Sequence, residues 1–401
     1  MSTSILYHAF GLEGINHKST KFIGNKVVFT AEIKDHHVKC PNCGRRRVIF
    51  KGQKTRQFIM SLLGRKKCIL NLTLHRLRCA NCNNLWWPHL SFMIGKHRFT
   101  RSFANTVLDL LQFGTIQSVA HYFGVSWDLI KQIHKSKLQV LYRRIPLHKI
   151  KYIGIDEFSL REGHNYMTVF TDLPTGRILH AVEGKSKEDI RPFLEKLAKR
   201  AKNLEAVAMD MSSSFFWAVS ETLPHVEVVF DRYHVVALMN RGIDDLRRDL
   251  QNELEGLDQK ILKGTRFLLL RNYDSLAPDR KARLDALFQA NYPLYLMHSM
   301  KEQLRLLWEK EDRESAQKFL IIWCQDAMQS GIKQLIKIAK TLAVYSRGLL
   351  NYFNHHITSG AVEGLVNKIK TLKRQAYGFR DMEYFKLRLY HLHTQRYSLT
   401  G

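Results

Sequence analysis

The spacing of apolar and polar residues changes its period along this 401-residue chain. Up to about residue 95, apolar and polar residues alternate in short runs such as Lys26 to Ile33, which predicts a small β-rich module. From residue 99 the apolar residues Phe103, Val107 and Leu110 recur every three or four positions, which predicts helices. Gly124-Val125-Ser126 then separates two short helical runs, as the turn of a helix-turn-helix does.

The middle of the chain predicts a mixed α/β domain. Strand-like runs at 152–156, 166–172 and 177–182 follow one another directly, whereas the runs at 204–209 and 226–230 each come after a helical segment. The order β-β-β-α-β-α-β predicts a mixed sheet with antiparallel strands on one side and parallel crossovers on the other. This is an RNase H-like arrangement.

A long helical segment interrupts this domain. Residues 236–354 are rich in Leu, Lys, Arg, Gln and Glu and carry few strand signals, and a long amphipathic helix follows them. The predicted domains are a β-rich module at 1–95, a helix-turn-helix domain at 96–145, the two parts of an α/β domain at 146–235 and 355–401, and a helical insertion at 236–354.

Charge narrows the choice of partners. The chain has 63 Lys and Arg against 36 Asp and Glu, a net charge of +27, so we expect it to bind a polyanion. It has no run of 18 or more apolar residues and no signal-peptide pattern, so we expect a cytoplasmic protein without a membrane span. An anionic lipid surface is the alternative partner, but the basic residues are spread over several segments and do not form one amphipathic helix.

Two cysteine pairs in the β-rich module predict a structural zinc site. Cys40-x-x-Cys43 and Cys79-x-x-Cys82 are separated by 35 residues, and each pair can offer two thiolates from one turn. The alternative is four unliganded thiols. This alternative is less favoured, because a small β module gains much of its stability from a bound metal.

The helix after Gly124 is a candidate DNA-recognition helix. In a helix-turn-helix the second helix, here about residues 126–137, lies in the major groove with its first residues near the base edges. Trp127, Lys131 and Gln132 are the expected contacts. The alternative is a pair of packed helices that never touches DNA.

Two aspartates follow apolar runs and could share metal ions. Asp156 comes after Ile153 to Ile155, and Asp210 comes after Ala206 to Met209. The first and fourth strands of an RNase H-like sheet are neighbours, so both carboxylates can reach a pair of divalent ions that catalyses phosphoryl transfer. An Asp at a strand end can instead cap the following turn or helix.

The third acid is expected on the amphipathic helix after the insertion. Its apolar stripe leaves Glu363, Lys370 and Arg374 on an adjacent polar face. Glu363 can then face the metal ions, and Lys370, two turns later, can hold a DNA phosphate. Alternatively, Glu363 is a solvated acid that the helix dipole favours in the first turn.

Three blocks of sequence together resemble the DDE transposases of bacterial insertion sequences, most closely the ISL-three family, and the resemblance covers nearly the whole chain. They are Gly154 to Phe158, Asp231 to His234, and above all Ser359 to Lys370 with Arg374, Ala376, Tyr377, Gly378 and Phe379. The paired cysteines and the helix-turn-helix also look like that family.

The resemblance implies that the chain binds the ends of an element in double-stranded DNA, nicks them hydrolytically and transfers strands to a target. Asp156, Asp210 and Glu363 map onto the three acids, with two Mg²⁺ or Mn²⁺ ions, while zinc is structural. Asp231 remains the alternative second acid. We prefer Asp210 because its strand is expected beside the first, and Asp231 with His234 resembles an auxiliary motif that positions DNA. Joining two ends implies a homodimer or a higher oligomer on DNA, associated with the nucleoid.

Two other functions remain open at this stage. The first is a zinc-containing helix-turn-helix regulator that binds DNA without catalysis, and the second is a structure-specific nuclease without strand transfer. The long block around Glu363 favours the transposase.

Overall fold

A computed structural model describes most of the chain and divides it into two compact units, residues 1–143 and residues 144–393. The described residues are 4–34, 39–95, 97–160, 165–253, 262–358, 360–375 and 380–394, without the side chains of residues 361, 363, 375 and 394.

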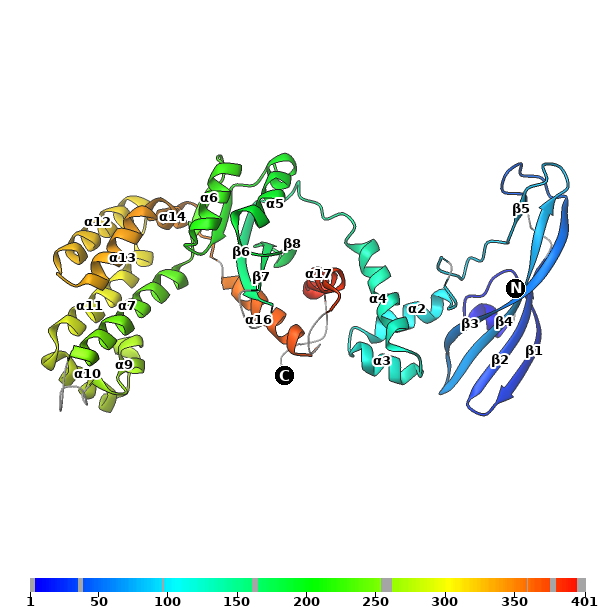
Figure 1. Ribbon diagram of the computed structural model, residues 1–401, viewed down its shortest axis with the longest axis horizontal. Helices are drawn as coiled ribbons and strands as arrows, with labels where there is room; N and C mark the ends of the chain where they lie inside the picture. Colours follow the sequence, from blue (N-terminus) through cyan, green and yellow to red (C-terminus); the bar gives the residue numbers. More distant parts are fainter. Residues whose placement is uncertain are drawn as a thin grey trace. The chain divides into compact units, whose positions relative to one another are not determined.

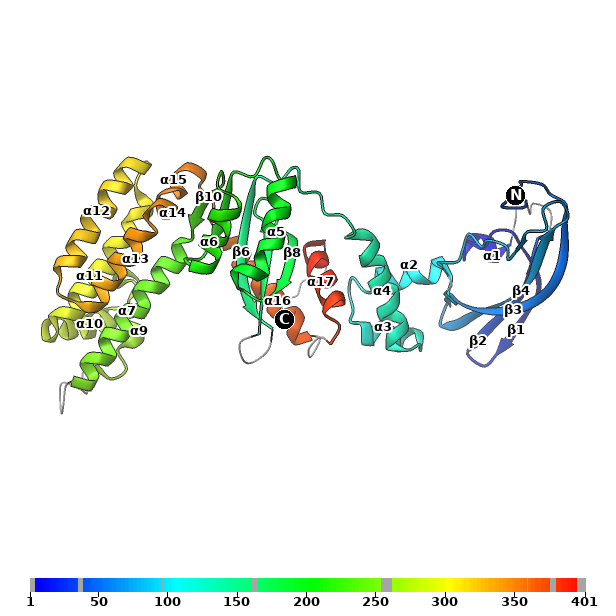
Figure 2. The same cartoon turned by 45° about the horizontal axis from the view of Figure 1, so that its top comes forward.

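The first unit begins with a curved sheet in the order β1-β2-β4-β3. All its neighbouring strands are antiparallel except β2 and β4, and the short β5 pairs with β4. Figure 2 shows α1 on the concave side of the sheet. The elements are α1 Ile5–His8, β1 Ile15–Ile23, β2 Lys26–Ile33, β3 Val48–Leu63, β4 Lys66–Cys79 and β5 Leu85–Trp86.

Alternating burial explains this sheet. Along β4 every second side chain from Cys68 to Leu74 is buried, and Phe58 and Met60 of β3 pair with the same face. These side chains form a core of their own with residues of α1 and β2.

Three helices complete the first unit: α2 Arg101–Leu110, α3 Ile116–Phe123 and α4 Trp127–Leu141. Thr100, Thr115 and Ser126 cap them by accepting a backbone N–H in the first turn. Gly124 ends α3 in the left-handed conformation at φ 57°, which a glycine adopts without steric cost.

The second unit is built on a mixed sheet in the order β10-β9-β6-β7-β8. β6, β7 and β8 are antiparallel neighbours, whereas β9 and β10 run parallel to β6. The predicted mixed α/β class is therefore confirmed. The strands are β6 Tyr152–Ser159, β7 Tyr166–Asp172, β8 Arg177–Glu183, β9 Ala206–Met209 and β10 Glu227–Phe230 (Figure 1). β6 continues to Ser159, beyond the predicted end at Asp156, because it keeps pairing with β7 after its ladder with β9 has ended.

Helices cover both faces of this sheet. Ile153 and Ile155 belong to a core that also contains buried residues of α5 Lys187–Arg200 and α6 Ser213–Thr222. Gly154, between them, faces the opposite side and touches α16 Gly360–Gln375. α17 Met382–His391 packs beside β8.

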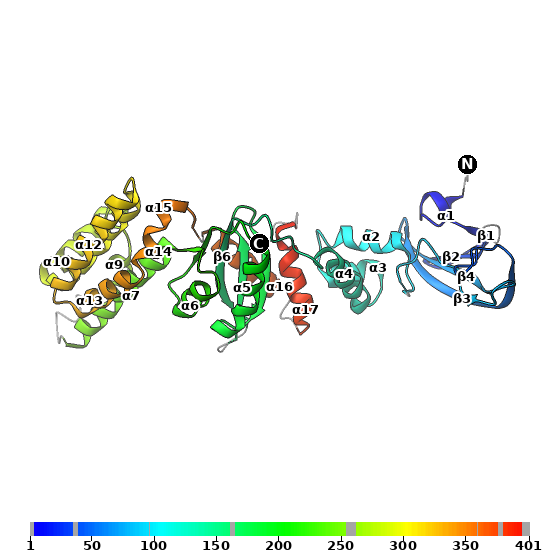
Figure 3. The same cartoon turned by 90° about the horizontal axis from the view of Figure 1, so that it is seen from above.

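Between β10 and α16 the described residues are mostly helical, and Figure 2 and Figure 3 show α7, α9, α10, α12 and α13 side by side as a bundle. α7 starts directly after β10, and Gly242 on it lets Ile338 and Met297 approach closely. No helix among the described residues is long and apolar enough to cross a membrane. The remaining elements are α7 Arg232–Glu253, α9 Arg266–Leu270, α10 Pro278–Ala290, α11 Tyr292–Arg305, α12 Arg313–Gln329, α13 Lys333–Val344, α14 Ser346–Leu350, α15 Tyr352–His355 and the 3₁₀ turns η2 Tyr273–Ser275, η3 Leu306–Glu309 and η4 Leu392–Thr394.

Candidate active site and metal centre

Three aspartates lie at one edge of the second sheet. Asp156 is on β6, Asp210 directly follows β9 and Asp231 directly follows β10. The registers pair Gly154 with Ala208 and Met209 with Phe230, and the three strands are parallel. Neighbouring strands are about 4.8 Å apart, so the aspartates reach the same edge of the sheet side by side.

Asp156 lies close enough to Asp210 for the charge of Asp210 to act on it. Both are half-buried, and burial raises the pKa of each carboxyl above its ordinary value. The charge of Asp210 adds to the rise at Asp156, while the Glu157 N–H, which donates to Asp156 Oδ1 at 2.8 Å, opposes it. A bound cation would relieve the repulsion from Asp210 that helps to raise the pKa of Asp156.

The basic residues that oppose these shifts come from separate elements. His234 on α7 lowers the pKa of both Asp156 and Asp210, and Lys370 on α16 lowers that of Asp156. The structure therefore brings His234 and Lys370 near the acids. Arg374 is exposed one turn after Lys370.

Glu157 is an acid that sequence reasoning missed. Burial and the charges of Asp210 and Asp156 raise its pKa, and Lys185 Nζ lies 3.8 Å from Glu157 Oε1. Its position in the block Gly154 to Phe158 was the available signal, but strand alternation turns it to the face opposite Asp156.

α16 runs alongside β6 in the same direction. A Cβ on Gly154 would collide with Val362 near the start of the helix, and Lys373 near its end donates to the Ser159 carbonyl. Eleven helical residues and five strand residues both span about 16 Å, which fits this parallel arrangement. Asp156 shares the face of β6 with Gly154 and therefore points to the side on which α16 lies.

The predicted third acid lies on this helix, next to Val362. Glu363 is in the first turn of α16, but its side chain lies outside the described residues, as do Ser359 and residues 376–379 of the same block.

Asp231 has a local structural partner. It is only 7% exposed, and its Oδ1 accepts the backbone N–H of Tyr233 at 3.0 Å. Its carbonyl accepts the N–H of His234 at 3.1 Å. Asp231 thus caps the start of α7, a role that helix N-termini favour.

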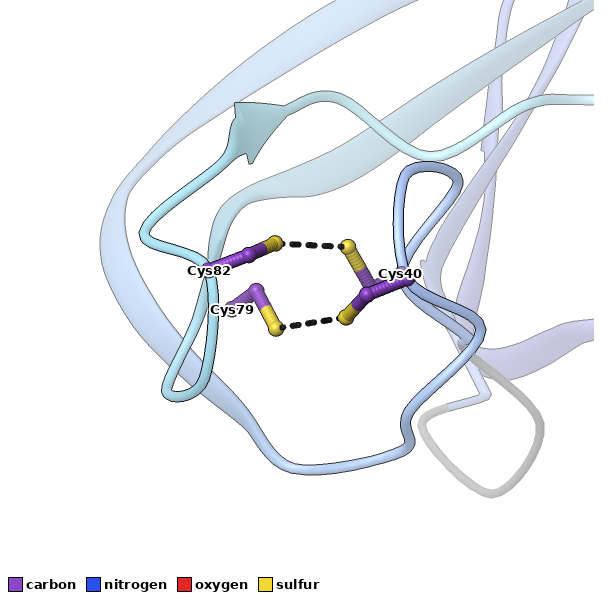
Figure 4. Close-up of side chains that lie close together, drawn as sticks. Cys40, Cys79 and Cys82 are labelled. Carbon is purple, nitrogen blue, oxygen red and sulfur yellow. Dashed lines mark hydrogen bonds between the residues drawn. The ribbon is translucent and has the colours of Figure 1, made fainter.

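Four cysteines converge in the first unit. The Sγ atoms of Cys40 and Cys82, and those of Cys43 and Cys79, are each 3.5 Å apart (Figure 4). All four sulfurs lie within 4.8 Å of one another. Tetrahedral zinc with bonds of 2.3 Å sets its sulfurs about 3.8 Å apart, so this donor set fits the metal.

Each cysteine pair is held by its own backbone turn, and the two turns are of the same kind. The Gly44 N–H donates to the Cys40 carbonyl and the Asn83 N–H to the Cys79 carbonyl, and both donors have positive φ. Backbone hydrogen bonding, first of all from Asn84, lowers the pKa of Cys82 to about 6. The pKa of Cys79 is also lowered, first of all by backbone hydrogen bonding, so the second pair favours the thiolate that a metal requires. Against a backbone hydrogen bond from Arg45, burial and the other three thiols raise the pKa of Cys43 to about 11.

The candidate recognition residues are on the first turns of α4. Trp127 is 41% exposed, Lys131 Nζ lies 5.3 Å from the centroid of its ring, and Gln132 is exposed. The charged amine and the ring thus lie on one side of the helix.

A strongly basic chain whose mixed sheet gathers carboxylates at one edge has the features of an enzyme that acts on nucleic acid. A family model described as a transposase, of the DDE class and the ISL-three branch, matches residues 153–389. The transposase of insertion sequence element IS1001 from Bordetella parapertussis is 36% identical over 80% of this chain and 80% of that protein. The transposase of IS1557 from Mycobacterium tuberculosis is 25% identical over 86% of this chain and 83% of that protein.

A solved structure, the Drosophila P element transposase strand transfer complex, covers 76% of this chain and 94% of that chain at 10% identity. Its TM-score of 0.37 is too low to define a shared fold.

The chain belongs to the ISL-three family of DDE transposases of insertion sequences. The predicted family is confirmed, and with it an enzyme that cleaves DNA and transfers strands. Membership also implies a DNA substrate and the use of divalent metal ions.

Proposed function

We propose that the chain cleaves and joins the DNA ends of its insertion sequence with Asp156, Asp210 and Glu363 as the ligands of two Mg²⁺ or Mn²⁺ ions. The observation that carries this proposal is the placement of Asp156 and Asp210 on neighbouring strands at one sheet edge. The helix that carries Glu363 packs on β6 through Gly154 and Val362, two residues from Asp156 in the strand.

The sheet order supports an RNase H-like catalytic domain. Three antiparallel strands are extended on one side by two parallel strands, each reached through a helix, and a helical segment precedes α16. In this arrangement Asp156 belongs to the first strand and Asp210 to the fourth, the positions from which two acids can share metal ions.

The protein's own groups have distinct tasks. Asp156 and Asp210 offer carboxylate oxygens from the sheet, and Glu363 offers them from the helix. Divalent ions held by these three residues would supply activation of a water or a 3′-hydroxyl and stabilisation of the leaving oxygen. Lys370 holds a DNA phosphate beside the acids, Arg374 contacts the backbone further along, and His234 helps to position the scissile phosphate.

We favour Asp210 over Asp231 as the second acid. The charge of Asp210 contributes to the raised pKa of Asp156, which supports a shared site for the two carboxylates. Asp231 instead caps α7 through the Tyr233 N–H. Asp231 and His234 are then auxiliary groups.

The first unit supplies DNA binding. A zinc ion held by Cys40, Cys43, Cys79 and Cys82 stabilises its sheet, and α3 with α4 forms a helix-turn-helix. Trp127, Lys131 and Gln132 on α4 contact the major groove of an element end. Two ends are held by a homodimer or a higher oligomer on DNA.

Cleavage of labelled element ends in Mg²⁺ tests the catalytic proposal. The Asp156→Asn variant should bind the ends with unchanged affinity and cleave them about 10³-fold more slowly, because metal ions supply several kcal/mol of transition-state stabilisation. Cleavage by Asp156→Asn at the wild-type rate would contradict the proposal.

The choice of second acid is tested in the same assay. Asp210→Asn should slow cleavage about 10³-fold, as Asp156→Asn does. Asp231→Asn should leave the free energy of unfolding nearly unchanged, because asparagine caps a helix about as well as aspartate, and should retain part of the activity. The reverse pattern, in two folded proteins, would make Asp231 the second acid.

A further inference from the structure

Acidic residues are missing from a long stretch of the first unit. Residues 36–108 contain 15 Lys and Arg and no Asp or Glu. A surface-exposed run of mixed charge needs no ligand, whereas cations without acids of their own repel one another and attract a polyanion.

Part of this charge is gathered on one face of β3 and β4. Along β3, Phe58 is buried, but Arg56 and Lys54, the next residues on the same face, are only half-buried. They pair with Leu72 and Leu74 of β4, so the core face of the sheet becomes cationic where its apolar core ends.

Arg76 continues this face on β4, two residues after Leu74, and is exposed. Trp87, just after β5, holds Lys54, whose Nζ lies 3.5 Å from the centroid of the indole. We call Lys54, Arg56, Arg76 and Trp87 the ribbon cation cluster.

The cluster lacks a counter-charge within the described part of the chain. None of Lys54, Arg56 and Arg76 forms an ion pair with an acid there. Partial burial lowers the pKa of Lys54, and the charges of Arg56 and Arg76 lower it further. An anion placed between these side chains would remove that repulsion.

We propose that the ribbon cation cluster binds the phosphate backbone of duplex DNA. This contact is separate from α4 and gives affinity without reading the sequence, because phosphates are the same at every base pair. It rests on the DNA substrate of the family and is independent of the catalytic acids. Trp87 acts as a positioning residue that keeps the Lys54 amine next to Arg56 and Arg76.

The salt dependence of DNA binding by the full-length zinc-loaded chain tests this proposal. The variant Lys54→Gln/Arg56→Gln/Arg76→Gln and the wild type are titrated, without divalent ions, onto an element-end duplex and onto a random duplex of equal length. Each lost phosphate contact lowers the slope of log Kd against log salt by about 0.9, so we expect a fall of about 2.7. The loss of affinity should be the same factor on both duplexes.

A matched variant removes the same charge elsewhere. Lys196, Lys199 and Arg200 are exposed on α5 of the second unit, and their replacement by Gln should leave the slope close to that of the wild type. The proposal would be overturned if the cluster variant had the same salt slope as this control. It would also be overturned by a loss of affinity confined to the element-end duplex, or by a wild-type protein that binds single strands more tightly than duplex. Zinc content and circular dichroism report whether each variant is folded. If the triple variant does not fold, single variants of Lys54 and Arg76 replace it, and each should lower the salt slope by about 0.9.

The two proposals fail in different ways. Asp156→Asn should leave the salt slope unchanged and slow cleavage about 10³-fold, whereas the cluster variant should change the slope and still cleave any end that it binds at high protein concentration. A cleavage-deficient cluster variant at saturating binding would place the cluster in the catalytic step and contradict its proposed role.

Discussion

The two units of this transposase differ most in their content of acidic residues. Residues 1–143 contain 23 Lys and Arg against five Asp and Glu, while the remaining 258 residues contain 40 against 31. The first unit thus carries two thirds of the net charge of +27 in about a third of the chain. The second unit has abundant acids and gathers three of them at one sheet edge. The proposed function would therefore concentrate affinity for DNA and the chemistry on DNA in different parts of the sequence.

The units also differ in what stabilises them. The second unit has a continuous core that joins its sheet to α5, α6 and the helical segment. The sheet of the first unit has a separate, smaller core, and the four cysteines lie outside it. Small cores commonly need a metal or disulfides, so the first unit should depend on its metal and the second should not.

Removal of zinc should have the largest effect and separates the units. Structural zinc contributes about 10–16 kcal/mol of apparent binding energy in small domains, so Cys82→Ser or a chelator should unfold the zinc-binding part of the first unit. We expect the affinity for element ends to fall by more than about 10³-fold, because specific protein–DNA binding is stronger than non-specific binding by at least this factor. The thermal transition of the second unit should remain.

Cys324→Ser in the second unit is the matched control, because Cys324 is a half-buried thiol outside the cluster. It should retain zinc and end binding. Metal analysis should give about one zinc ion per chain for four thiolates. Full end binding by a metal-free protein would refute the structural role.

The comparison also shows which features were predictable from sequence. The cysteine site is built from two short turns, so the spacing of the cysteines was sufficient to predict it. The order of the strands was predicted from the periodicity of the apolar residues. The ribbon cation cluster was not predicted, because it depends on which residues pair between β3 and β4 and on the contact between Lys54 and Trp87.

The candidate active site was predictable only in part. Asp156 and Asp210 follow apolar runs, which places them at a sheet edge once the strand order is known. The contact of Gly154 with Val362 joins residues more than 200 positions apart, and no local pattern predicts it. The capping role of Asp231 and the proximity of Glu157 likewise depend on tertiary structure.

Gly154→Ala tests how closely the chemistry depends on packing in the second unit. The new Cβ would collide with Val362 and would lie 2.9 Å from Leu173 Cδ2, so α16 must move away from β6. We expect a loss of about 1–3 kcal/mol of stability from this overpacking. Cleavage should fall by about a hundredfold or more, because small displacements of catalytic groups are costly, while binding of ends is retained.

Gly364→Ala on the same helix is the control. Gly364 is exposed and a Cβ there meets nothing within 4 Å, so the change should stabilise the helix by about 0.5–1 kcal/mol. Normal cleavage by Gly154→Ala would show that the position of α16 is unimportant for catalysis and would weaken the assignment of Glu363.

Gly124→Ala tests the corresponding turn of the first unit and should have the smallest effect. Gly124 has φ 57°, and alanine in the left-handed region costs about 1 kcal/mol. The new Cβ also displaces the Lys67 amine, which donates to the Gly124 carbonyl at 3.1 Å. Gly64→Ala in the same unit, at φ 58° with nothing within 4 Å, carries the backbone cost alone. Chemical denaturation of both zinc-loaded variants should show Gly124→Ala as the less stable, and Lys67→Ala should remove the difference between them. Equal stabilities in the presence of Lys67 would mean that this contact adds nothing to the turn between α3 and α4.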